Sequence, residues 1–513
     1  MPKGRALPCC CLPVYLLVSS CSGSSTGTNV QGNAGGAGGS TTSGENDAAT
    51  SPGGGGASPD SATGDAGGGT AGGGAVGGDA SGAGSDGGYP TSCADLGAEP
   101  SIPMACATVL ATKSAPSGGV PTDETTLDTA AIQAAIDACP AGQSVKLSVS
   151  GDKNALLSGA LSLKAGVTLW IDTGTTLFAS RNPRDFDPKP NQCAQSGGGG
   201  SCRALINVEG ITNAGVMGDG AIDGRGGEQV IGGTPTWWDL EKTYAGKLVA
   251  PRLIQVSSSR AFTLYKITLR NSPKFHVVID STNGFTVWGI TINTPATAPN
   301  TDGVDPSGSV NGLIAYNKIS TGDDNVALKG SGPIIDNIIV AHNHFGSGHG
   351  MSIGSETYGG VKNVKVCDLS LDGTTNGLRI KSDSSRGGLV QAISYSDVCM
   401  RKVESPFVFD PFYSTATGAR IPDFQDITLT NVHVLGGGDS TLRGYDAAHP
   451  LTIAFDNVIV DDVKNAPIDA GDAQIRLGPG PVNLAPTGTN VKVTRSVTGT
   501  APPKACDNAW VTF

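Results

Sequence analysis

The chain has 513 residues, with 34 Lys and Arg against 45 Asp and Glu and a formal net charge of −11. An acidic balance argues against nucleic acid as a partner, because binding to phosphates depends on clustered cations. It also means that an anionic ligand must be attracted by local cations rather than by the charge of the whole protein.

The first 21 residues have the pattern of a bacterial export signal. Lys3 and Arg5 precede an apolar stretch, Leu7–Val18, that is too short to span a bilayer. The string VSSC that ends at Cys21 resembles a lipobox, which implies lipidation of Cys21 and attachment to a membrane through it. The alternative is an ordinary secretory signal with a chance cysteine. Both interpretations predict an extracellular protein or a cell-surface lipoprotein of a bacterium.

The signal peptide with its lipobox (1–21) is followed by a segment, 22–91, made of Gly, Ser, Ala and Thr with scattered Asp. Such a segment cannot bury enough apolar surface to offset its conformational entropy, so we predict a disordered linker. The remainder, 92–513, is long for one domain, but repeat architectures reach such lengths. We therefore expect one folded catalytic domain over 92–513.

Twelve cysteines fit an exported protein. Loss of three cysteines with the signal and lipidation of Cys21 leave eight: Cys93, Cys106, Cys139, Cys193, Cys202, Cys367, Cys399 and Cys506. An even number permits full pairing, and Cys193 with Cys202, which bracket a Gly-rich loop, is the expected pair. No Cys/His spacing suggests a zinc site, and we expect no metal and no cofactor.

One helix is predicted, at the start of the domain. Asp128 is its candidate N-cap, and Pro140 with Gly142 ends it. Its apolar stripe consists of Ile132, Ala135, Ile136 and Cys139. We expect this helix to cap the N-terminal end of the fold, because an uncovered edge of stacked strands invites aggregation.

Beyond the helix, short strand segments recur about every 22 to 29 residues. One family comprises Arg252–Val256, Phe275–Ile279, Gly303–Asp305, Asn325–Lys329, Met351–Ile353, Gly377–Lys381 and Pro406–Phe409. A second family runs in step with it: Phe285–Val287, Gly312–Ala315, Ile338–Val340 and Val361–Val364. This period with almost no helix predicts an all-β parallel β-helix. Leucine-rich repeats need a Leu/Asn consensus that the chain lacks, and a propeller blade needs about forty residues.

Four polar segments lie about one repeat apart: Asn300-Thr301-Asp302, Gly322-Asp323-Asp324, Gly348-His349-Gly350 and Arg379-Ile380-Lys381. Neighbouring rungs of a parallel sheet are about 4.8 Å apart, so these segments would form a column on one wall. Alternation along a strand puts Arg379 and Lys381 on one face, and the two glycines beside His349 would let a sugar approach. Acids, a histidine and two cations suit acid-catalysed attack on an anionic sugar polymer.

Each segment alone has a plainer explanation as a turn, a solvated corner or a loop histidine. Their order and register together favour a functional site. Lys329 could support the acidic cluster or simply occupy the surface.

The four segments resemble the signatures of polygalacturonases, glycoside hydrolase family 28. Longer stretches, among them APNTDGVDP and GHGMSIGSETYG, are similar to bacterial secreted endopolygalacturonases, and the likeness covers roughly Cys106 to Val463. Gly322 stands where many fungal and plant members have Gln. The resemblance implies a right-handed, single-stranded parallel β-helix of the pectin-lyase-like class. It also implies hydrolysis of α-1,4-D-galacturonosyl linkages of polygalacturonate, or de-esterified pectin, by endo action with inversion. We expect the protein to be a monomer.

The resemblance also implies roles for single residues. Asp323 would be the general acid, Asp302 and Asp324 would hold and deprotonate the attacking water, and His349 would share a proton with the acid. The substrate would be bound by Asn300, Arg379, Lys381 and Tyr413. An acid beside other carboxylates is expected to have a raised pKa. One rung, about 4.8 Å, is shorter than the usual spacing of about 6.5–9.5 Å between acid and base in inverting enzymes.

Four alternatives remain open at this stage. An exo-polygalacturonase or a rhamnogalacturonan hydrolase would share the motifs, although Arg379 and Lys381 favour plain galacturonan. A calcium-dependent pectate lyase would need a metal cluster and a cationic base. A non-catalytic surface β-helix adhesin would not need the acids at all.

Overall fold

The structure is a computed structural model that describes residues 89–116, 119–196, 200–244 and 246–512. The predicted signal, Cys21 and the linker up to residue 88 lie outside these residues. Thirty strands of the described chain join in one sheet, and the strand-to-strand pairings are parallel. The helical elements described with them are α1 (Thr129–Ala138), α2 (Trp237–Thr243) and two short 3-10 turns, η1 (Pro183–Phe186) and η2 (Val463–Asn465). Neither described helix has the length and apolar character of a membrane span.

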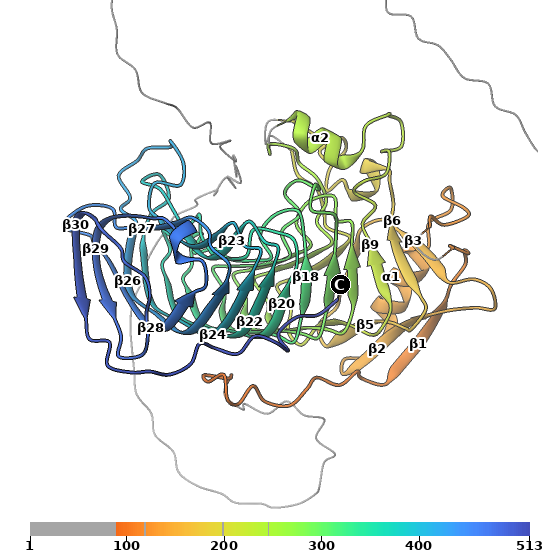
Figure 1. The fold of residues 1–513 in the computed structure, drawn as a ribbon. Coiled ribbons are helices and arrows are strands. Elements are labelled where there is room, and N and C mark those ends of the chain that lie inside the picture. Colours follow the sequence, from red (N-terminus) through yellow and green to blue (C-terminus); the bar gives the residue numbers. More distant parts are fainter. Residues whose placement is uncertain (1–88, 117–118, 197–199, 245, 513) are drawn as a thin grey trace, which may run out of the picture. The chain divides into compact units, whose positions relative to one another are not determined.

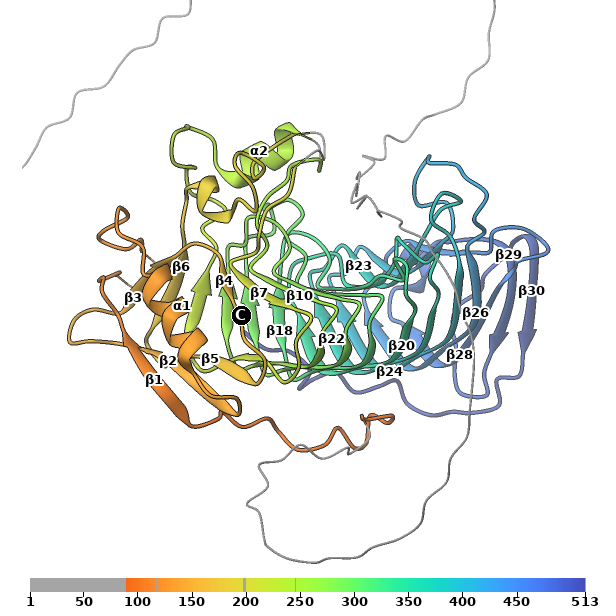
Figure 2. The same ribbon diagram turned by 180° about the vertical axis from the view of Figure 1, so that it is seen from behind.

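The predicted parallel β-helix is confirmed: coil follows coil from β1 to β30 (Figures 1 and 2). Three ladders of strands run along the coils. The first ladder carries the polar motifs and consists of β4 (Leu161–Ser162), β7 (Ile206–Glu209), β10 (Ile254–Ser257), β13 (Val277–Asp280), β16 (Val304–Ser307), β19 (Val326–Leu328), β21 (Met351–Ile353), β23 (Asn376–Lys381), β25 (Ser405–Asp410), β27 (Ser440–Arg443) and β29 (Ile468–Leu477).

The second ladder runs from the first strand to the last. It consists of β1 (Ala105–Leu110), β2 (Gln143–Ser148), β5 (Val167–Ile171), β8 (Gly215–Met217), β11 (Arg260–Tyr265), β14 (Asn283–Trp288), β17 (Val310–Ala315), β20 (Ile335–Phe345), β22 (Val361–Asp372), β24 (Leu389–Arg401), β26 (Asp423–Leu435), β28 (Leu451–Val460), the second half of β29, and β30 (Gly488–Arg495).

The third ladder begins as separate strands and continues as the second halves of long ones. Its separate strands are β3 (Ala155–Ser158), β6 (Thr176–Ala179), β9 (Ala221–Asp223), β12 (Thr268–Arg270), β15 (Thr291–Asn293) and β18 (Lys318–Ser320). From β20 to β28 each strand turns the corner between ladders at a residue with positive φ: His342, Asp368, Asp397, Asn431 and Asn457. Asn and Asp tolerate this conformation better than β-branched residues do, which explains their recurrence at the corner.

Apolar side chains stack inside the coils. In the first ladder Val304, Val326, Met351, Leu378 and Phe407 are register partners in that order, and each is at most 1% exposed. Truncation of such a residue to alanine typically costs about 2–5 kcal/mol. The neighbouring side chains of each strand therefore point outward in a fixed register, and this register positions the site.

The helix predicted at the N-terminal end is α1, and Ile132 and Ile136 are its buried residues. Asp128 is the N-cap residue, as predicted, but its side chain makes no capping hydrogen bond to the helix. It accepts instead from Thr112 Oγ1 and Leu157 N, at 2.7 and 2.8 Å, and pairs with Lys113 at 3.1 Å. Asp128 thus ties the segment before the helix to the first coils.

The eight cysteines predicted to pair do so. The bonds are Cys93–Cys367, Cys106–Cys139, Cys193–Cys202 and Cys399–Cys506. Cys193–Cys202 is the pair that the Gly-rich loop predicted. Cys106–Cys139 joins β1 to the end of α1, and two of the bonds bridge more than a hundred residues of sequence.

Candidate active site

The polar motifs lie at the point where each coil enters the first ladder. Asp302 precedes β16, Asp323 and Asp324 precede β19, and His349 precedes β21. Backbone bonds hold these turns in contact, with Gly303 N donating to Asp324 O at 2.8 Å and His349 N to Asp323 O at 2.9 Å. The structure therefore brings the predicted column together on neighbouring coils.

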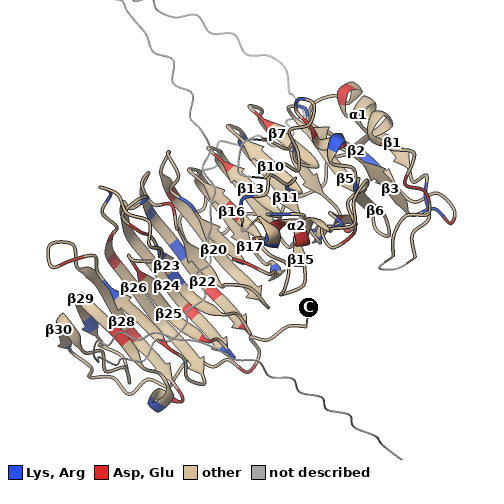
Figure 3. Ribbon diagram, turned by 90° about the horizontal axis from the view of Figure 1, so that it is seen from above, with Lys and Arg blue, Asp and Glu red and all other residues tan. Residues whose placement is uncertain are grey.

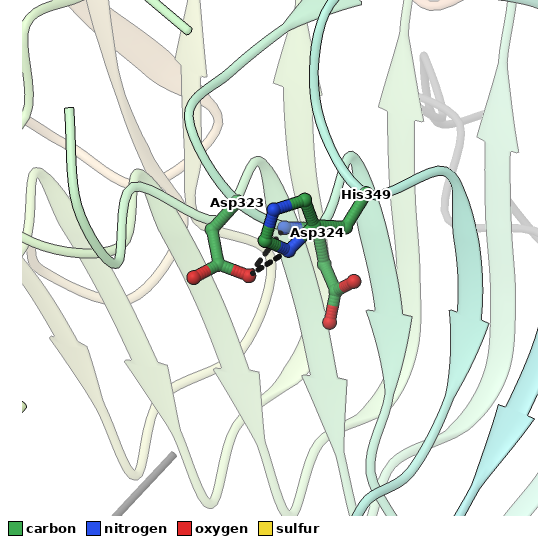
Figure 4. A group of neighbouring side chains, drawn as sticks. All are labelled: Asp323, Asp324 and His349. Atoms are coloured by element: carbon green, nitrogen blue, oxygen red, sulfur yellow. Dashed lines mark hydrogen bonds and ion pairs between the residues drawn. The ribbon is translucent and has the colours of Figure 1, made fainter. Parts of the chain in front are cut away.

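Asp323 and His349 face each other. His349 Nδ1 lies 3.0 Å from Asp323 Oδ1, and the two side chains are 12% and 10% exposed. The same Asp323 oxygen accepts from Asp324 N at 2.8 Å. Figure 4 shows the Asp323 carboxylate beside the imidazole ring, whereas the Asp324 carboxylate points in another direction. A carboxyl group with an imidazole partner and limited access to water is suited to proton transfer.

Asp324 is surrounded by positive charge and a hydroxyl. Lys381 Nζ lies 3.1 Å from Oδ2, Arg379 Nη2 lies 3.3 Å from Oδ1, and Ser352 Oγ donates to Oδ1 at 2.7 Å. All four side chains are at most 5% exposed. Arg379 is the register partner of Ser352, and alternation points Lys381 to the same face. Opposite charges at this distance favour the ionised form of a buried carboxylate.

Asp302 and Asp305 share one lysine. Lys329 Nζ lies 3.2 Å from Asp302 Oδ2 and 2.9 Å from Asp305 Oδ2. Burial, followed by the charge of Asp305, raises the pKa of Asp302 well above its ordinary value. Burial also raises the pKa of Asp305, and Lys329 opposes that rise. The carboxyl pair therefore retains a proton to a higher pH than isolated aspartates do.

Asn300 does not join this cluster through any bond the structure describes. Its amide Nδ2 donates to Glu241 Oε1 of α2. Glu241 is 1% exposed and pairs with Lys274 Nζ at 3.2 Å. In this structure Asn300 therefore connects the Asp302 turn to α2, which lies over the coils in Figure 1.

Tyr413 lies in the loop after β25, against three cations. Its ring centroid is 4.8 Å from Lys381 Nζ and 5.7 and 5.9 Å from the guanidinium carbons of Arg379 and Arg386. Tyr413 N donates to Ser382 O at 2.9 Å, which fixes the loop beside β23. The structure thus places the predicted substrate-binding residues Arg379, Lys381 and Tyr413 in one group.

The glycines around His349 have a packing reason that the sequence did not reveal. Gly348 and Gly350 have φ values of +138° and +80°. A Cβ at Gly348 would lie 2.5 Å from Asn325 Oδ1, and a Cβ at Gly350 would lie 2.1 Å from Asn376 O. Only glycine fits these positions, because neighbouring coils press against both. We predicted that they leave room for a sugar, and the contacts assign them to the packing of coils.

Ligand atoms of Asp323, Asp324 and His349 lie within 4.8 Å of one another, as in a metal site. The donors of this group are already engaged, because Asp324 accepts from Ser352 and pairs with Arg379 and Lys381. Two cations on one carboxylate oppose the addition of a divalent ion there.

Three residues of the site escaped the sequence analysis: Asp305, Ser352 and Glu241. For Asp305 and Ser352 a signal existed, because each alternates with buried neighbours on a predicted strand and so points outward with Arg379. For Glu241 no signal existed, since its contact with Asn300 depends on how α2 folds over the coils.

Comparisons with known proteins find similarity to one family of enzymes. Residues 139–471 match the model of glycosyl hydrolases family 28. The chain is 45% identical over 451 residues to a polygalacturonase of Ralstonia nicotianae, covering 75% of this chain and 84% of that protein. It is 47% identical over 336 residues to an endo-polygalacturonase of Pectobacterium carotovorum subsp. carotovorum, covering 64% and 83%.

A solved polygalacturonase from Erwinia carotovora ssp. carotovora has the same fold. It superimposes with a TM-score of 0.69 and 42% identity, covering 75% of this chain and all of that structure.

Proposed function

The chain belongs to glycosyl hydrolases family 28, and we propose that it is an endo-acting polygalacturonase that hydrolyses α-1,4-D-galacturonosyl linkages in polygalacturonate. The observation that carries the proposal is the group around Asp323 and Asp324, in which one carboxyl faces His349 and the other faces Arg379 and Lys381. Two carboxyls with different partners can do different chemistry at one pH.

Asp323 is the proposed general acid. It delivers its proton to the glycosidic oxygen as the bond to the leaving sugar breaks, and His349 holds the carboxyl and exchanges a proton with it. The backbone bond from Asp324 N fixes the same oxygen, so the acid is held from two sides.

Asp324 and Asp302 are proposed to orient the attacking water and to take its proton. Arg379 and Lys381 support this role for Asp324, because they stabilise its ionised form. Asp302 can accept a proton only after it has lost its own. Lys329 favours that ionisation, whereas burial and Asp305 oppose it.

Arg379, Lys381 and Tyr413 are proposed to bind the sugar carboxylates near the cleaved bond. A guanidinium matches a carboxylate with a planar fork, and a lysine adds a point charge. The Tyr413 ring against both cations provides a flat surface beside them. Asn300 is also proposed to bind substrate. It lies in the turn before β16, and its side chain is held there by the hydrogen bond to Glu241.

Endo action is the mode that the relatives favour, and the size of early products tests it. Purified protein is incubated with polygalacturonate, and products are sized while only a small fraction of bonds is cut. We expect a mixture of long oligomers. Release of mainly monomers or dimers from the start would support an exo-polygalacturonase, and cleavage of rhamnogalacturonan alone would defeat the substrate assignment.

Inversion is tested by proton NMR of the first products. We expect the β-anomer to form first and then to mutarotate. Initial formation of the α-anomer would contradict the proposed water attack opposite Asp323.

A lyase is the second candidate, favoured only by the metal-like grouping of Asp323, Asp324 and His349. A lyase would form an unsaturated product that absorbs in the ultraviolet and would lose activity in chelator. We expect no such absorbance and full activity in excess chelator.

We propose that the protein is exported and that Cys21 is its lipid-attachment site, with the domain acting as a monomer outside the cell. Mass spectrometry of the native N-terminus tests lipidation, and light scattering of the domain tests its oligomeric state. An unmodified N-terminus that begins beyond Cys21 would contradict the anchor.

A further inference from the structure

A pocket of about 440 Å³ lies at the C-terminal end of the first ladder. Its walls come from β27, β29 and the start of β30, together with Phe412 from the loop after β25. Its polar groups include Arg443, Asp469 and Thr489. The mechanism proposed above makes no use of it.

The pocket lies on the same face of the same ladder as the cations of the site. Lys381 is the register partner of Asp410, and Phe409 pairs with Leu442, so Arg443 continues the row that starts at Lys381. Leu442 is fully buried, and alternation therefore points Arg443 outward as it does Lys381. Two strand spacings separate Lys381 from Arg443 along this row, a distance of about 10 Å. In the ribbon of Figure 3, basic segments of β23 lie beside an acidic segment of β25, its neighbour in the ladder.

One loop connects the two places. Tyr413 packs on Lys381 and Arg379, and the preceding residue, Phe412, lines the pocket. Phe412 is 49% exposed, and its ring stacks on Tyr445 with centroids 5.4 Å apart and planes 23° apart. A paired, exposed aromatic surface is rigid and suits contact with the apolar face of a sugar ring.

Arg443 is the group that can recognise a carboxylate in this pocket. Its side chain is 41% exposed, and Nη2 pairs with Asp469 Oδ2 at 2.6 Å. Its Nε is shielded from solvent and has no hydrogen-bond partner among the described residues. Asp469 is itself 58% exposed, so it can swing away when another carboxylate approaches.

From this arrangement we propose that the pocket is a distal subsite for a uronate unit, with Arg443 on the carboxylate and Phe412 beneath the ring. The proposal rests on the proposed action on polygalacturonate and extends it to substrate length. A uronate chain that crosses Arg379 and Lys381 and runs along the ladder reaches Arg443 two coils later. Only chains long enough to span both places gain from the pocket.

The experiment compares wild type with Arg443→Gln on oligogalacturonates of defined, increasing length. We expect KM for the long oligomers to rise roughly three- to tenfold, as for loss of a partly exposed charge-assisted hydrogen bond, and KM for the shortest cleaved oligomer to stay unchanged. Arg476→Gln is the matched control, because Arg476 is an exposed arginine of β29, the strand that holds Asp469, but lies in the half of β29 that belongs to the second ladder. An equal effect of Arg443→Gln at every length, or none at any length, overturns the subsite.

Asp469→Asn should change KM for long oligomers in the opposite direction to Arg443→Gln. It frees Arg443 and removes a negative charge from the pocket, so KM for long oligomers should fall. If Arg443 were only a structural partner of Asp469, both variants would have a lower melting temperature. Neither variant would then show a change in KM that depends on oligomer length.

Binding measured separately from cleavage keeps the two proposals distinguishable. Calorimetric titration of long oligogalacturonates into the inactive Asp323→Asn protein, with and without Arg443→Gln, tests the pocket directly. Failure of the wild-type protein to cleave polygalacturonate would contradict the proposed function. If wild type cleaves normally but Asp323→Asn binds long oligomers with the same affinity with and without Arg443→Gln, only the subsite proposal is contradicted.

Discussion

Lys381 Nζ lies 3.1 Å from Asp324 Oδ2, and each side chain is 1% exposed. The residue that the sequence suggests as a substrate ligand is therefore also the counter-charge of a proposed catalytic carboxylate. If a sugar carboxylate binds near Lys381 as proposed, its binding and the ionisation of Asp324 are coupled through this one ammonium group.

Lys381→Met tests that coupling. Asp324 would keep Arg379 and Ser352 but lose one buried cation, so its ionised form would be less favoured. We expect kcat to fall, and the acidic limb of kcat/KM against pH to move to higher pH. A control, Lys362→Met, removes a more exposed lysine that pairs with Asp336 on the second ladder. A variant that raised KM alone, with an unmoved pH profile, would show that Lys381 acts only on the substrate.

Asp323→Asn removes the proton that the leaving oxygen requires. We expect turnover on polygalacturonate to fall at least about 10²-fold with little change in KM, as is typical for loss of a general acid. Asp336→Asn, which breaks a more exposed ion pair with Lys362, is the matched control and should retain activity. Turnover close to wild type in Asp323→Asn would overturn the assignment of Asp323 as the general acid, whereas absence of turnover in wild type would favour the non-catalytic adhesin.

Asp305→Asn changes the titration of Asp302 without touching the acid. The charge of Asp305 is, after burial, the second cause of the raised pKa of Asp302. Its removal should lower that pKa and leave Lys329 to pair with Asp302 alone. Because Asp302 must be ionised to act as a base, the acidic limb of kcat/KM should move to lower pH. A limb that stays in place would exclude Asp302 as the group whose titration limits activity.

The architecture could be predicted because it follows from period and alternation. Repeats of about 22 to 29 residues required stacked coils, and the pattern around Ile380 placed Arg379 and Lys381 on one face. What could not be predicted depends on contacts between turns. Asn300 meets Glu241, and Asp128 meets Leu157 rather than its own helix, through loops whose paths no local pattern encodes. Of the two alternatives for Lys329, support of the acidic cluster is confirmed, but its pairing with both Asp302 and Asp305 could not be predicted, because it depends on the exact register between β16 and β19.

Asp302→Asn should stabilise the protein at neutral pH. Burial raises the pKa of Asp302 above its value in the unfolded chain, so the folded protein holds this proton more tightly. The stability linked to that proton is complete below the unfolded pKa of about 3.9 and is lost as pH rises through the folded pKa. The neutral asparagine avoids the loss, so its melting temperature should exceed that of wild type at pH 7, with a gain that shrinks towards pH 4. A gain independent of pH, or a loss at pH 7, would contradict the linkage.

Two disulfides that close loops of very different length should contribute unequally to stability. Cys399–Cys506 closes a separation of 107 residues, and it fastens a C-terminal segment that also meets the sheet through Lys504 O on His433 and Trp510 over Arg401. Cys193–Cys202 closes a separation of nine. In the chain-entropy model the longer loop restricts the unfolded state more, so loss of Cys399–Cys506 should cost about 2–4 kcal/mol and loss of Cys193–Cys202 less. Melting temperatures of the paired Cys→Ala variants, measured under oxidising conditions, test the order. A larger loss for the short loop would mean that strain or local packing, rather than chain entropy, governs both bonds.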